Sequence, residues 1–140
     1  MNTKIIWSDQ KPLDSISTFR LLEEKLNICL PNEVKTFLKE HNGGCSDKLF
    51  FHDFFYNEYC FSNILNFELK TDDSDILDLF ELLSNNDGTY RFLPFGEDQA
   101  GNILCLDCWK ASFPVMLYDL TQDEFLYIDK DIETFFLSLN

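Results

Sequence analysis

The stretch from residue 90 to residue 107 reads YRFLPFGEDQAGNILCLD and carries the strongest fold signal in the chain. Two apolar runs, 90–95 and 102–107, lie on either side of a polar segment, 96–101, that begins and ends with glycine. Apolar runs of this length are typical of strands, and glycine adopts the backbone conformations that tight turns require. The stretch therefore predicts two neighbouring antiparallel strands joined by a turn over 96–101.

Aromatic and apolar residues on both sides of this hairpin predict further strands. Residues 115–119 and 124–128 form a second hairpin pattern across the polar residues 120–123. Residues 48–67 are dense in Phe and Tyr, which favours strands, with a turn of helix over 54–61 left open as an alternative. We therefore expect a sheet of about five to six strands.

Four segments carry apolar residues at the three- and four-residue spacing of an amphipathic helix. The stripes are Ile16, Phe19, Leu22 and Leu26 after Asp14-Ser15; Val34, Phe37, Leu38 and His41 in 30–42; Ile76, Leu79, Phe80 and Leu83 in 75–83; and Ile132, Phe135, Phe136 and Leu139 in 129–139. Pro31 suits the first position of the second helix, and Gly43 and Gly44 suit its end. The sequence thus predicts four helices.

The elements follow in the order helix, helix, strands, helix, four strands, helix. Strands joined by short turns pair antiparallel, and helices grouped before, between and after them cover the sheet. We predict an α+β fold: a mainly antiparallel sheet of about five to six strands covered by flanking helices, in one domain over 1–140. The patterns leave open whether Trp7 and the rest of residues 1–14 pack or form a loose N-terminal segment.

Acidic residues are in large excess, with 25 Asp and Glu against 11 Lys and Arg and a formal net charge of −14. Residues 1–70 hold 10 acids and 8 bases, whereas residues 71–140 hold 15 acids and 3 bases. Such a surface repels phosphate backbones and anionic membranes, so we expect neither nucleic acid nor membrane as a partner. The chain also has no apolar run of membrane-spanning length and no signal-peptide pattern in residues 1–10, which predicts a cytoplasmic protein.

The five cysteines form no regular disulfide framework, and we interpret them as reduced, mostly buried thiols. Cys105 and Cys108 form a single CxxC pair at the end of a predicted strand, whereas a zinc ribbon needs two pairs and a redox pair normally opens a helix. The two histidines with Cys45 and Cys60 match no common ligand spacing. We expect no metal and no cofactor; a zinc or redox protein using Cys105 and Cys108 is the alternative.

Paired carboxylates support acid–base catalysis when burial separates their pKa values. Glu97 and Asp98 lie in the predicted turn, with Asp107 across the hairpin, but the sequence places no nucleophile and base beside them. Acids in turns are usually solvated. The common catalytic and nucleotide-binding motifs are absent from the chain. We therefore predict that the protein is not an enzyme.

The densest acidic run is Asp72, Asp73 and Asp75, followed at three-residue intervals by Asp78 and Glu81. Acids at a helix N-terminus meet the positive end of the helix dipole, so helix capping accounts for the first three. The run lacks the glycine and the spacing of a calcium-binding EF-hand loop. Capping does not account for the charge of the whole second half, which favours a surface that steers a partner.

Three groups of short motifs follow one another along the chain. They are EEKLNI at 23–28 with Leu30-Pro31, VKTFL at 34–38 and HNGG at 41–44; FLPFG at 92–96 with Asp98 and GNILCLD at 101–107; and the strand 115–119 with the helix 132–139. Their order and spacing resemble the SUKH superfamily, which includes fungal cell-wall assembly regulators and bacterial immunity proteins. The resemblance runs from about residue 15 to the end, and residues 48–67 and 97–100 depart from its pattern.

The resemblance implies a binding protein, and its immunity branch implies one that occludes a cognate toxin. We predict an immunity protein that neutralises a bacterial polymorphic toxin domain, such as a nuclease, by covering a basic active-site groove. The predicted partner-binding residues are Asp72, Asp73, Asp75, Asp78, Glu81, Glu97 and Asp98. The alternative is a non-enzymatic regulatory or scaffolding module of the cell-wall-regulator type. We expect a monomer or a weak homodimer.

Overall fold

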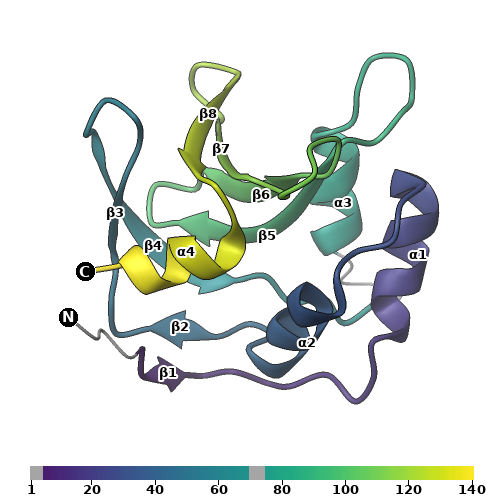
Figure 1. Ribbon diagram of the computed structural model, residues 1–140, viewed down its shortest axis with the longest axis horizontal. Coiled ribbons are helices and arrows are strands. Elements are labelled where there is room, and N and C mark those ends of the chain that lie inside the picture. The colour runs from purple at the N-terminus through teal and green to yellow at the C-terminus, as the bar shows by residue number, and fades with distance from the viewer. Residues whose placement is uncertain (1–4, 70–74) are drawn as a thin grey trace.

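The computed structural model describes residues 5–69 and 75–140 and confirms the predicted α+β fold (Figure 1). Its centre is a six-stranded antiparallel sheet with the strand order β3-β4-β5-β6-β7-β8. The strands are β3 (Phe50–His52), β4 (Glu58–Ile64), β5 (Phe92–Asp98), β6 (Ile103–Asp107), β7 (Val115–Asp119) and β8 (Glu124–Asp129). Strands that follow one another along the chain are also neighbours in the sheet, although the connection from β4 to β5 is long and contains a helix.

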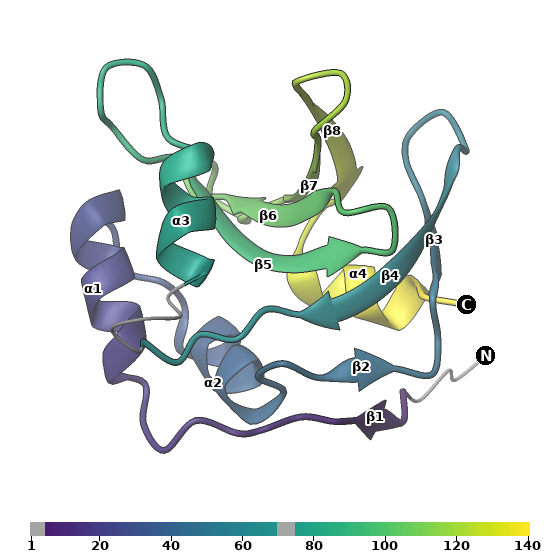
Figure 2. The same cartoon turned by 180° about the vertical axis from the view of Figure 1, so that it is seen from behind.

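Four helices lie around this sheet. They are α1 (Ser17–Leu26), α2 (Asn32–Glu40), α3 (Asp75–Leu82) and α4 (Ile132–Ser138). α1 lies beside α3, where Lys25 and Glu81 form an ion pair, and α2 lies beside α4, where the rings of Phe37 and Phe136 are 5.0 Å apart (Figures 1 and 2). None of the helices within the described ranges has both the length and the apolar character needed to cross a membrane.

The strand β6 is buried on both of its faces. Leu104 and Leu106 belong to the main core, which the helices cover, whereas Ile103 and Cys105 point into a second, smaller cluster. The second cluster also contains Leu83 and Phe92, with Leu79, Met116, Tyr118 and Phe125 packed at its edge. A strand buried on both faces reads as an uninterrupted apolar run, which explains why this part of the sequence carries so clear a signal.

The N-terminal segment packs against the domain from residue 5 onward. β1 (Trp7–Ser8) pairs antiparallel with β2 (Cys45–Ser46). The Trp7 ring stacks on the His41 ring with their centroids 4.4 Å apart and lies 5.4 Å from the Phe136 ring. The segment that the sequence left open is therefore fixed by one strand pair and one aromatic anchor.

The predicted turn over 96–101 is displaced along the chain. β5 continues as far as Asp98, so the turn occupies residues 99–102. Gly101 has a φ of +89°, a conformation that favours glycine, so this glycine serves the turn as predicted. The two residues that were expected in the turn, Glu97 and Asp98, are therefore strand residues.

Gly96 has a different role from the predicted one. It lies within β5 and pairs with Leu104 of β6 and Ile64 of β4. A Cβ atom on Gly96 would lie 3.1 Å from the carbonyl oxygen of Asn63 and 3.3 Å from the ring of Phe61. Glycine at this position allows a close approach of neighbouring strands at a bulge, a role that sequence patterns do not separate from a turn.

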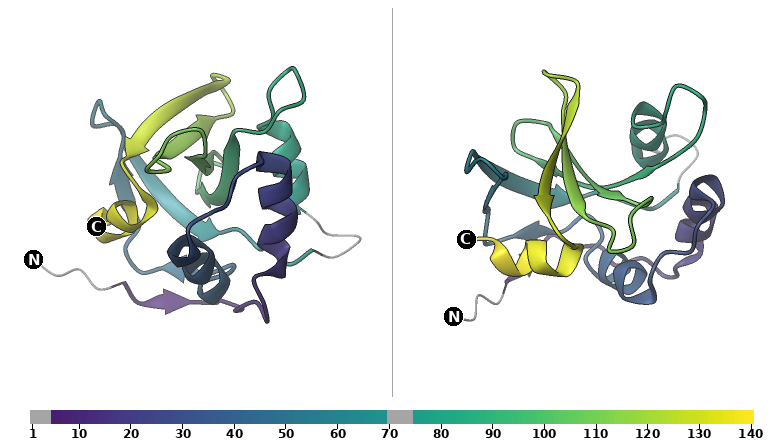
Figure 3. Two further views of the ribbon diagram at one scale, coloured as in Figure 1. Left: turned by 45° about the vertical axis from the view of Figure 1, so that its right-hand side comes forward. Right: turned by 45° about the horizontal axis from the view of Figure 1, so that its top comes forward.

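The sheet is strongly twisted, so that β7 and β8 turn away from the direction of β4 and β5 (Figure 3). Register shifts interrupt three strand pairs, β4–β5, β5–β6 and β7–β8. A bulge bends its strand and increases the local right-handed twist, so these shifts account for the curvature.

Candidate functional site

The predicted acidic run is only partly visible in the structure. Asp72 and Asp73 lie outside the described residues, and Asp75 is described only by its backbone, which begins α3. Asp78 and Glu81 are exposed on the outer face of α3, opposite its buried stripe, as the spacing predicts. The described part of this patch therefore consists of two carboxylates on one helix face.

Glu81 connects α3 to its neighbours. Its carboxylate accepts a hydrogen bond from the hydroxyl of Tyr90 and lies 3.9 Å from the Lys25 ammonium group of α1. The Tyr90 ring in turn stacks on Phe80 with the centroids 4.6 Å apart. The Glu81 side chain is 57% exposed and is therefore accessible to a partner, and an exposed ion pair of this kind contributes little to stability.

The expectation of a solvated acid at Asp98 is wrong. Asp98 is only 4% exposed, and its Oδ1 atom accepts hydrogen bonds from the backbone N–H groups of Ala100 (3.0 Å) and Asn102 (2.8 Å). Its Oδ2 atom accepts a further bond from the side-chain amide of Asn102 at 3.0 Å. Three donors occupy this carboxylate, so Asp98 shapes the turn, whereas its neighbour Glu97 is half-buried at the surface.

The described residues of the predicted partner-binding set do not form one surface. α3 packs beside the beginning of β5, where Phe80 stacks on Tyr90, whereas Glu97 lies near the end of that strand. A strand of seven residues is about 20 Å long. The structure therefore separates the predicted set into an α3 patch and a second patch at the far end of β5.

The second patch belongs to a group of three turns. The antiparallel strand order brings the β3–β4, β5–β6 and β7–β8 turns to the same end of the sheet (Figures 1 and 2). The Gln99 N–H donates to the Cys60 carbonyl at 2.8 Å, and the Leu120 N–H donates to the side-chain oxygen of Asn102 at 3.3 Å. We call this region the hairpin end and define it as residues 52–58, 97–103 and 118–125.

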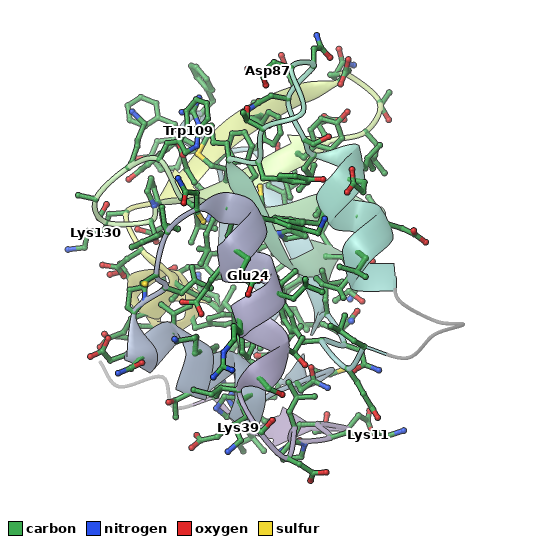
Figure 4. The ribbon with its side chains drawn as sticks, turned by 90° about the vertical axis from the view of Figure 1, so that its right-hand side faces the viewer. Lys11, Glu24, Lys39, Asp87, Trp109 and Lys130 are labelled. Atoms are coloured by element: carbon green, nitrogen blue, oxygen red, sulfur yellow. The ribbon has the colours of Figure 1, made fainter. Side chains whose placement is uncertain are left out.

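The hairpin end is acidic throughout. It contains seven acids and no Lys or Arg; the acids are Asp53, Glu58, Glu97, Asp98, Asp119, Asp123 and Glu124. All except Asp53 and Asp98 are exposed or half-exposed. The three bases of residues 71–140, Arg91, Lys110 and Lys130, lie beyond the opposite ends of the same strands (Lys130 is labelled in Figure 4). The opposite end also contains Asp107, Asp129 and Asp131, so bases offset acids there, whereas the acids of the hairpin end have no Lys or Arg beside them in these turns. No local sequence pattern reveals this difference.

At the opposite end, Asp107 has a structural partner. Arg91 donates to both carboxylate oxygens, Nε to Oδ1 at 2.9 Å and Nη2 to Oδ2 at 2.8 Å, and the Trp109 N–H donates to Oδ1 at 3.1 Å. Burial raises the pKa of Asp107, but the hydrogen bonds from Arg91 and Trp109 lower it by more, and the pKa lies below its usual value. This carboxylate stays ionised in its ion pair rather than available as a general acid.

Three consecutive aromatic side chains form the tip of the β3–β4 hairpin. Phe54, Phe55 and Tyr56 are 75%, 78% and 85% exposed. The chain turns at residues 54–55 and then enters β4, so the alternative of a helical turn over 54–61 is wrong. Aromatic residues favour strands, and composition alone did not identify these three as a solvent-facing tip.

Asp53 fixes the shape of this tip. Its Oδ1 atom accepts the N–H groups of Phe55 (2.8 Å) and Asn57 (3.0 Å), and its Oδ2 atom accepts the Asn57 side-chain amide and the Tyr59 hydroxyl, both at 2.9 Å. Burial raises the pKa of Asp53, but these hydrogen bonds together lower it below its usual value. The ionised carboxylate is therefore the form that the fold selects.

A separate groove of about 850 Å³ lies between α2, α4 and the loop after β6. Trp7, Phe37 and Phe136 give it an apolar wall, and His41 lies in the same wall. His41 packs against Trp7 and Phe37, in line with its place in the predicted apolar stripe, but its Nδ1 atom has no hydrogen-bond partner among the described residues. Burial lowers the pKa of His41, which favours the neutral ring at pH 7.

A family model described as the SMI1/KNR4 family (SUKH-1) matches residues 15–138. The chain belongs to this family. The match confirms the resemblance to the SUKH superfamily and contains the whole six-stranded sheet and all four described helices. No curated protein and no solved structure matches the chain.

The hairpin end and α3 both lie inside the SUKH-1 domain, whereas Trp7 precedes the matched range. Proteins of the SUKH-1 family are generally non-enzymatic immunity or regulatory proteins, and the family is linked to protein–protein interaction with toxins. A protein-binding surface is therefore the kind of site to look for in this domain.

Burial favours the protonated form of two thiols of this SUKH-1 domain, Cys105 and Cys108. All five cysteines are free. Burial raises the pKa of Cys108 to about 12 and raises the pKa of Cys105 well above its usual value. Cys105 belongs to the second cluster and Cys108 to the main core, so they pack with different groups of residues. Within residues 5–69 and 75–140, no three His, Cys, Asp or Glu side chains are grouped to hold a metal ion.

Proposed function

We propose that this SUKH-1 protein is an immunity protein that binds a bacterial polymorphic toxin domain and covers its basic active-site groove. The observation that carries the proposal is the charge of the hairpin end, where seven acids and no Lys or Arg come together from three separate turns. A surface of one charge attracts a partner of the opposite charge, and the family's link to toxins gives that partner its class.

A nuclease domain is the toxin class that fits best. Its substrate groove must be basic because it binds the phosphate backbone, and carboxylates of the immunity protein would occupy the positions of phosphates. Association steered by charge is fast and weakens as salt screens it. The same charge makes direct binding of nucleic acid by the immunity protein unfavourable.

The proposed contact surface has two parts. The first is the α3 patch, of which Asp78 and Glu81 are described; the predicted residues Asp72 and Asp73 lie outside the described residues, and Asp75 is described only by its backbone. The second is the hairpin end, where Glu97 is joined by Glu58, Asp119, Asp123 and Glu124. Asp98 is left out because its carboxylate is buried and already accepts three hydrogen bonds.

The protein would act by occupying a site rather than by catalysis. We propose that it needs no cofactor, works as a monomer and resides in the cytoplasm, where its five free thiols stay reduced. Like charge between two hairpin ends opposes self-association through this surface.

Co-expression with the product of the adjacent upstream gene tests the proposal. We expect the chain to restore growth to cells that this product poisons and to co-purify with it. Reversal of Glu58, Glu97, Asp123 and Glu124 to Lys should slow association at least 10-fold, whereas reversal of Glu24, Glu33 and Glu40 on α1 and α2 should have little effect. Full growth inhibition despite soluble wild-type chain would contradict the proposal.

A regulatory module is the second candidate, and the apolar groove favours it. The groove lies between α2 and α4 rather than at the hairpin end, and it would suit a partner bound by apolar contact. A large toxin gene directly upstream favours immunity, whereas a constant housekeeping neighbour favours regulation.

A further inference from the structure

The aromatic tip of the β3–β4 hairpin has no packing role that explains its composition. Phe54 and Phe55 contact each other edge to face, with their ring centroids 5.9 Å apart, and each is more than two-thirds exposed. By contrast, Phe51 and Phe61, on the two strands that lead to and from the tip, are buried in the main core. Large apolar side chains gathered on one exposed site mark interaction surfaces.

The tip is held in one shape before any partner arrives. The Asp53 N–H donates to the Asn57 carbonyl at 3.1 Å, and the Tyr56 N–H donates to the Asp53 carbonyl at 3.1 Å. The buried Asp53 carboxylate adds the four hydrogen bonds described above. A rigid aromatic side chain loses little conformational entropy on binding, so a fixed tip suits a tight interface.

The surroundings of the tip select the partner's chemistry. Glu58 lies two residues after Tyr56, and Glu97, Asp119, Asp123 and Glu124 lie at the two neighbouring turns. Lys and Arg are absent from all three turns. Apolar anchors surrounded by acids match a protein surface with an apolar pocket surrounded by bases.

We propose that Phe54, Phe55 and Tyr56 are the apolar anchor of this interface and insert into a pocket beside the basic groove of the partner protein. Interfaces concentrate their binding energy in a few aromatic residues at the centre, and charged residues at the rim set the association rate. This proposal rests on the proposed function for the nature of the partner. It adds the residues that hold the complex together after charge attraction has brought the two proteins into contact.

Two other occupants fit the same surface less well. An anionic membrane would accept the rings but be repelled by the acids of the hairpin end. A second copy of the chain would bring two acidic hairpin ends into contact with no Lys or Arg in either to pair them. The charge pattern therefore favours a basic protein.

The first experiment replaces Tyr56 by the photo-crosslinker p-benzoyl-phenylalanine in cells that also express the upstream gene. A matched chain carries the crosslinker at Ile6, which is also exposed but lies outside both parts of the proposed contact surface. We expect a crosslink at position 56 to one basic protein, identified by mass spectrometry, and none at comparable yield from position 6. A crosslink to lipid or to a second copy of the chain, or no protein adduct above the control, would overturn the proposal.

The second experiment measures affinity for the protein identified in this way. The variant Phe54→Ser/Phe55→Ser/Tyr56→Asn removes the rings from exposed positions, and Asn tolerates the positive φ of +64° at position 56. We expect binding about 30-fold weaker or more, mainly through faster dissociation, whereas the control Ile6→Ser/Leu137→Ser, at exposed positions outside the proposed contact surface, should bind as wild type. Thermal unfolding should be unchanged in both variants, and equal affinities would overturn the proposal.

The two proposals fail separately. If the crosslinked basic protein does not inhibit growth, the anchor stands and the immunity function falls. If the upstream product is neutralised by the variant that lacks the tip rings as well as by wild type, the immunity function stands and the anchor falls.

Discussion

Asp53 binds Asn57 through both oxygens of its carboxylate, to the backbone N–H at 3.0 Å and to the side-chain amide at 2.9 Å. Asp98 binds Asn102 in the same way, at 2.8 and 3.0 Å. Each Asp also accepts the N–H of the residue two positions later. One Asp-x-x-x-Asn pattern therefore builds two adjacent turns of the hairpin end, and the first of these presents the aromatic tip.

Removal of this clamp should loosen the tip. Asp53→Ala deletes four hydrogen bonds at a site that is 7% exposed, and we expect the free energy of unfolding to fall by about 2 kcal/mol, as measured by urea denaturation. Asn57→Ala deletes only the bond from the side-chain amide and keeps the other three, so it should cost clearly less. Equal stability of the wild-type chain and the Asp53→Ala variant would show that the clamp contributes nothing.

The clamp should also make stability depend on pH. The pKa of Asp53 is lower in the folded protein than in the unfolded chain, where it is about 3.9. The unfolded state therefore takes up the proton first as pH falls, and the stability from Asp53 is fully present above about pH 5 and is lost as pH falls through the folded pKa. The stability difference between wild type and Asp53→Asn should shrink between about pH 5 and pH 2; parallel curves would contradict this.

In the ion pair between Arg91 and Asp107, replacement of Arg91 should lower stability more than replacement of Asp107. The Asp107 side chain is 1% exposed and the Arg91 side chain is 31% exposed, so removal of Arg91 leaves a buried charge, whereas removal of Asp107 leaves a partly hydrated one. Arg91→Met should cost about 3 kcal/mol or more, and Asp107→Asn should cost less. Chemical denaturation measures the free energy of unfolding of both variants. A larger loss for Asp107→Asn than for Arg91→Met would show that burial of the remaining charge does not determine the cost.

Thiol reactivity should follow burial. Cys29 is exposed, whereas Cys105 and Cys108 are buried and have raised pKa values. Iodoacetamide at about pH 8 should label Cys29 first and leave Cys105 and Cys108 unlabelled until the chain unfolds. Mass spectrometry of labelled peptides provides the readout, and Cys29→Ser should remove the fast phase. Early labelling of Cys105 would contradict this prediction and favour the alternative in which Cys105 and Cys108 form a reactive pair.

The sequence predicted the elements whose signal is local. The stripe Phe19, Leu22 and Leu26 marks α1, and the apolar run at 103–106 marks β6, because burial on a helix face or on both strand faces leaves a regular pattern. Gly96 was misplaced because glycine signals both a turn and a close strand approach, and the choice between them depends on what the neighbouring strands do.

The candidate site was harder to predict because it is assembled by topology. Glu58, Glu97 and Asp119 are distant in sequence and meet only through the strand order. The acids of the α3 patch could be identified from the sequence because they are close together in it. The repeated Asp-x-x-x-Asn pattern at 53–57 and 98–102 was the one local signal that marked two turns of the same kind.

Salt should affect the acidic rim and the aromatic tip of the interface differently. Charge at the rim governs association, whereas the aromatic tip governs dissociation. Raising the salt concentration from about 0.05 M to about 0.5 M should therefore lower the association rate of wild type at least 10-fold and leave the dissociation rate nearly unchanged. Surface plasmon resonance with the co-purified toxin domain gives both rates, and a salt-independent association rate would remove charge steering.

The most direct test of the account is the association rate of the toxin domain with a chain in which Glu58, Glu97, Asp123 and Glu124 are replaced by Lys, measured by stopped flow at low salt. The account predicts a rate at least 10-fold below that of wild type, approached by wild type itself at high salt, while the Glu24, Glu33 and Glu40 control keeps the wild-type rate. A variant that associates as fast as wild type and still protects cells would contradict it.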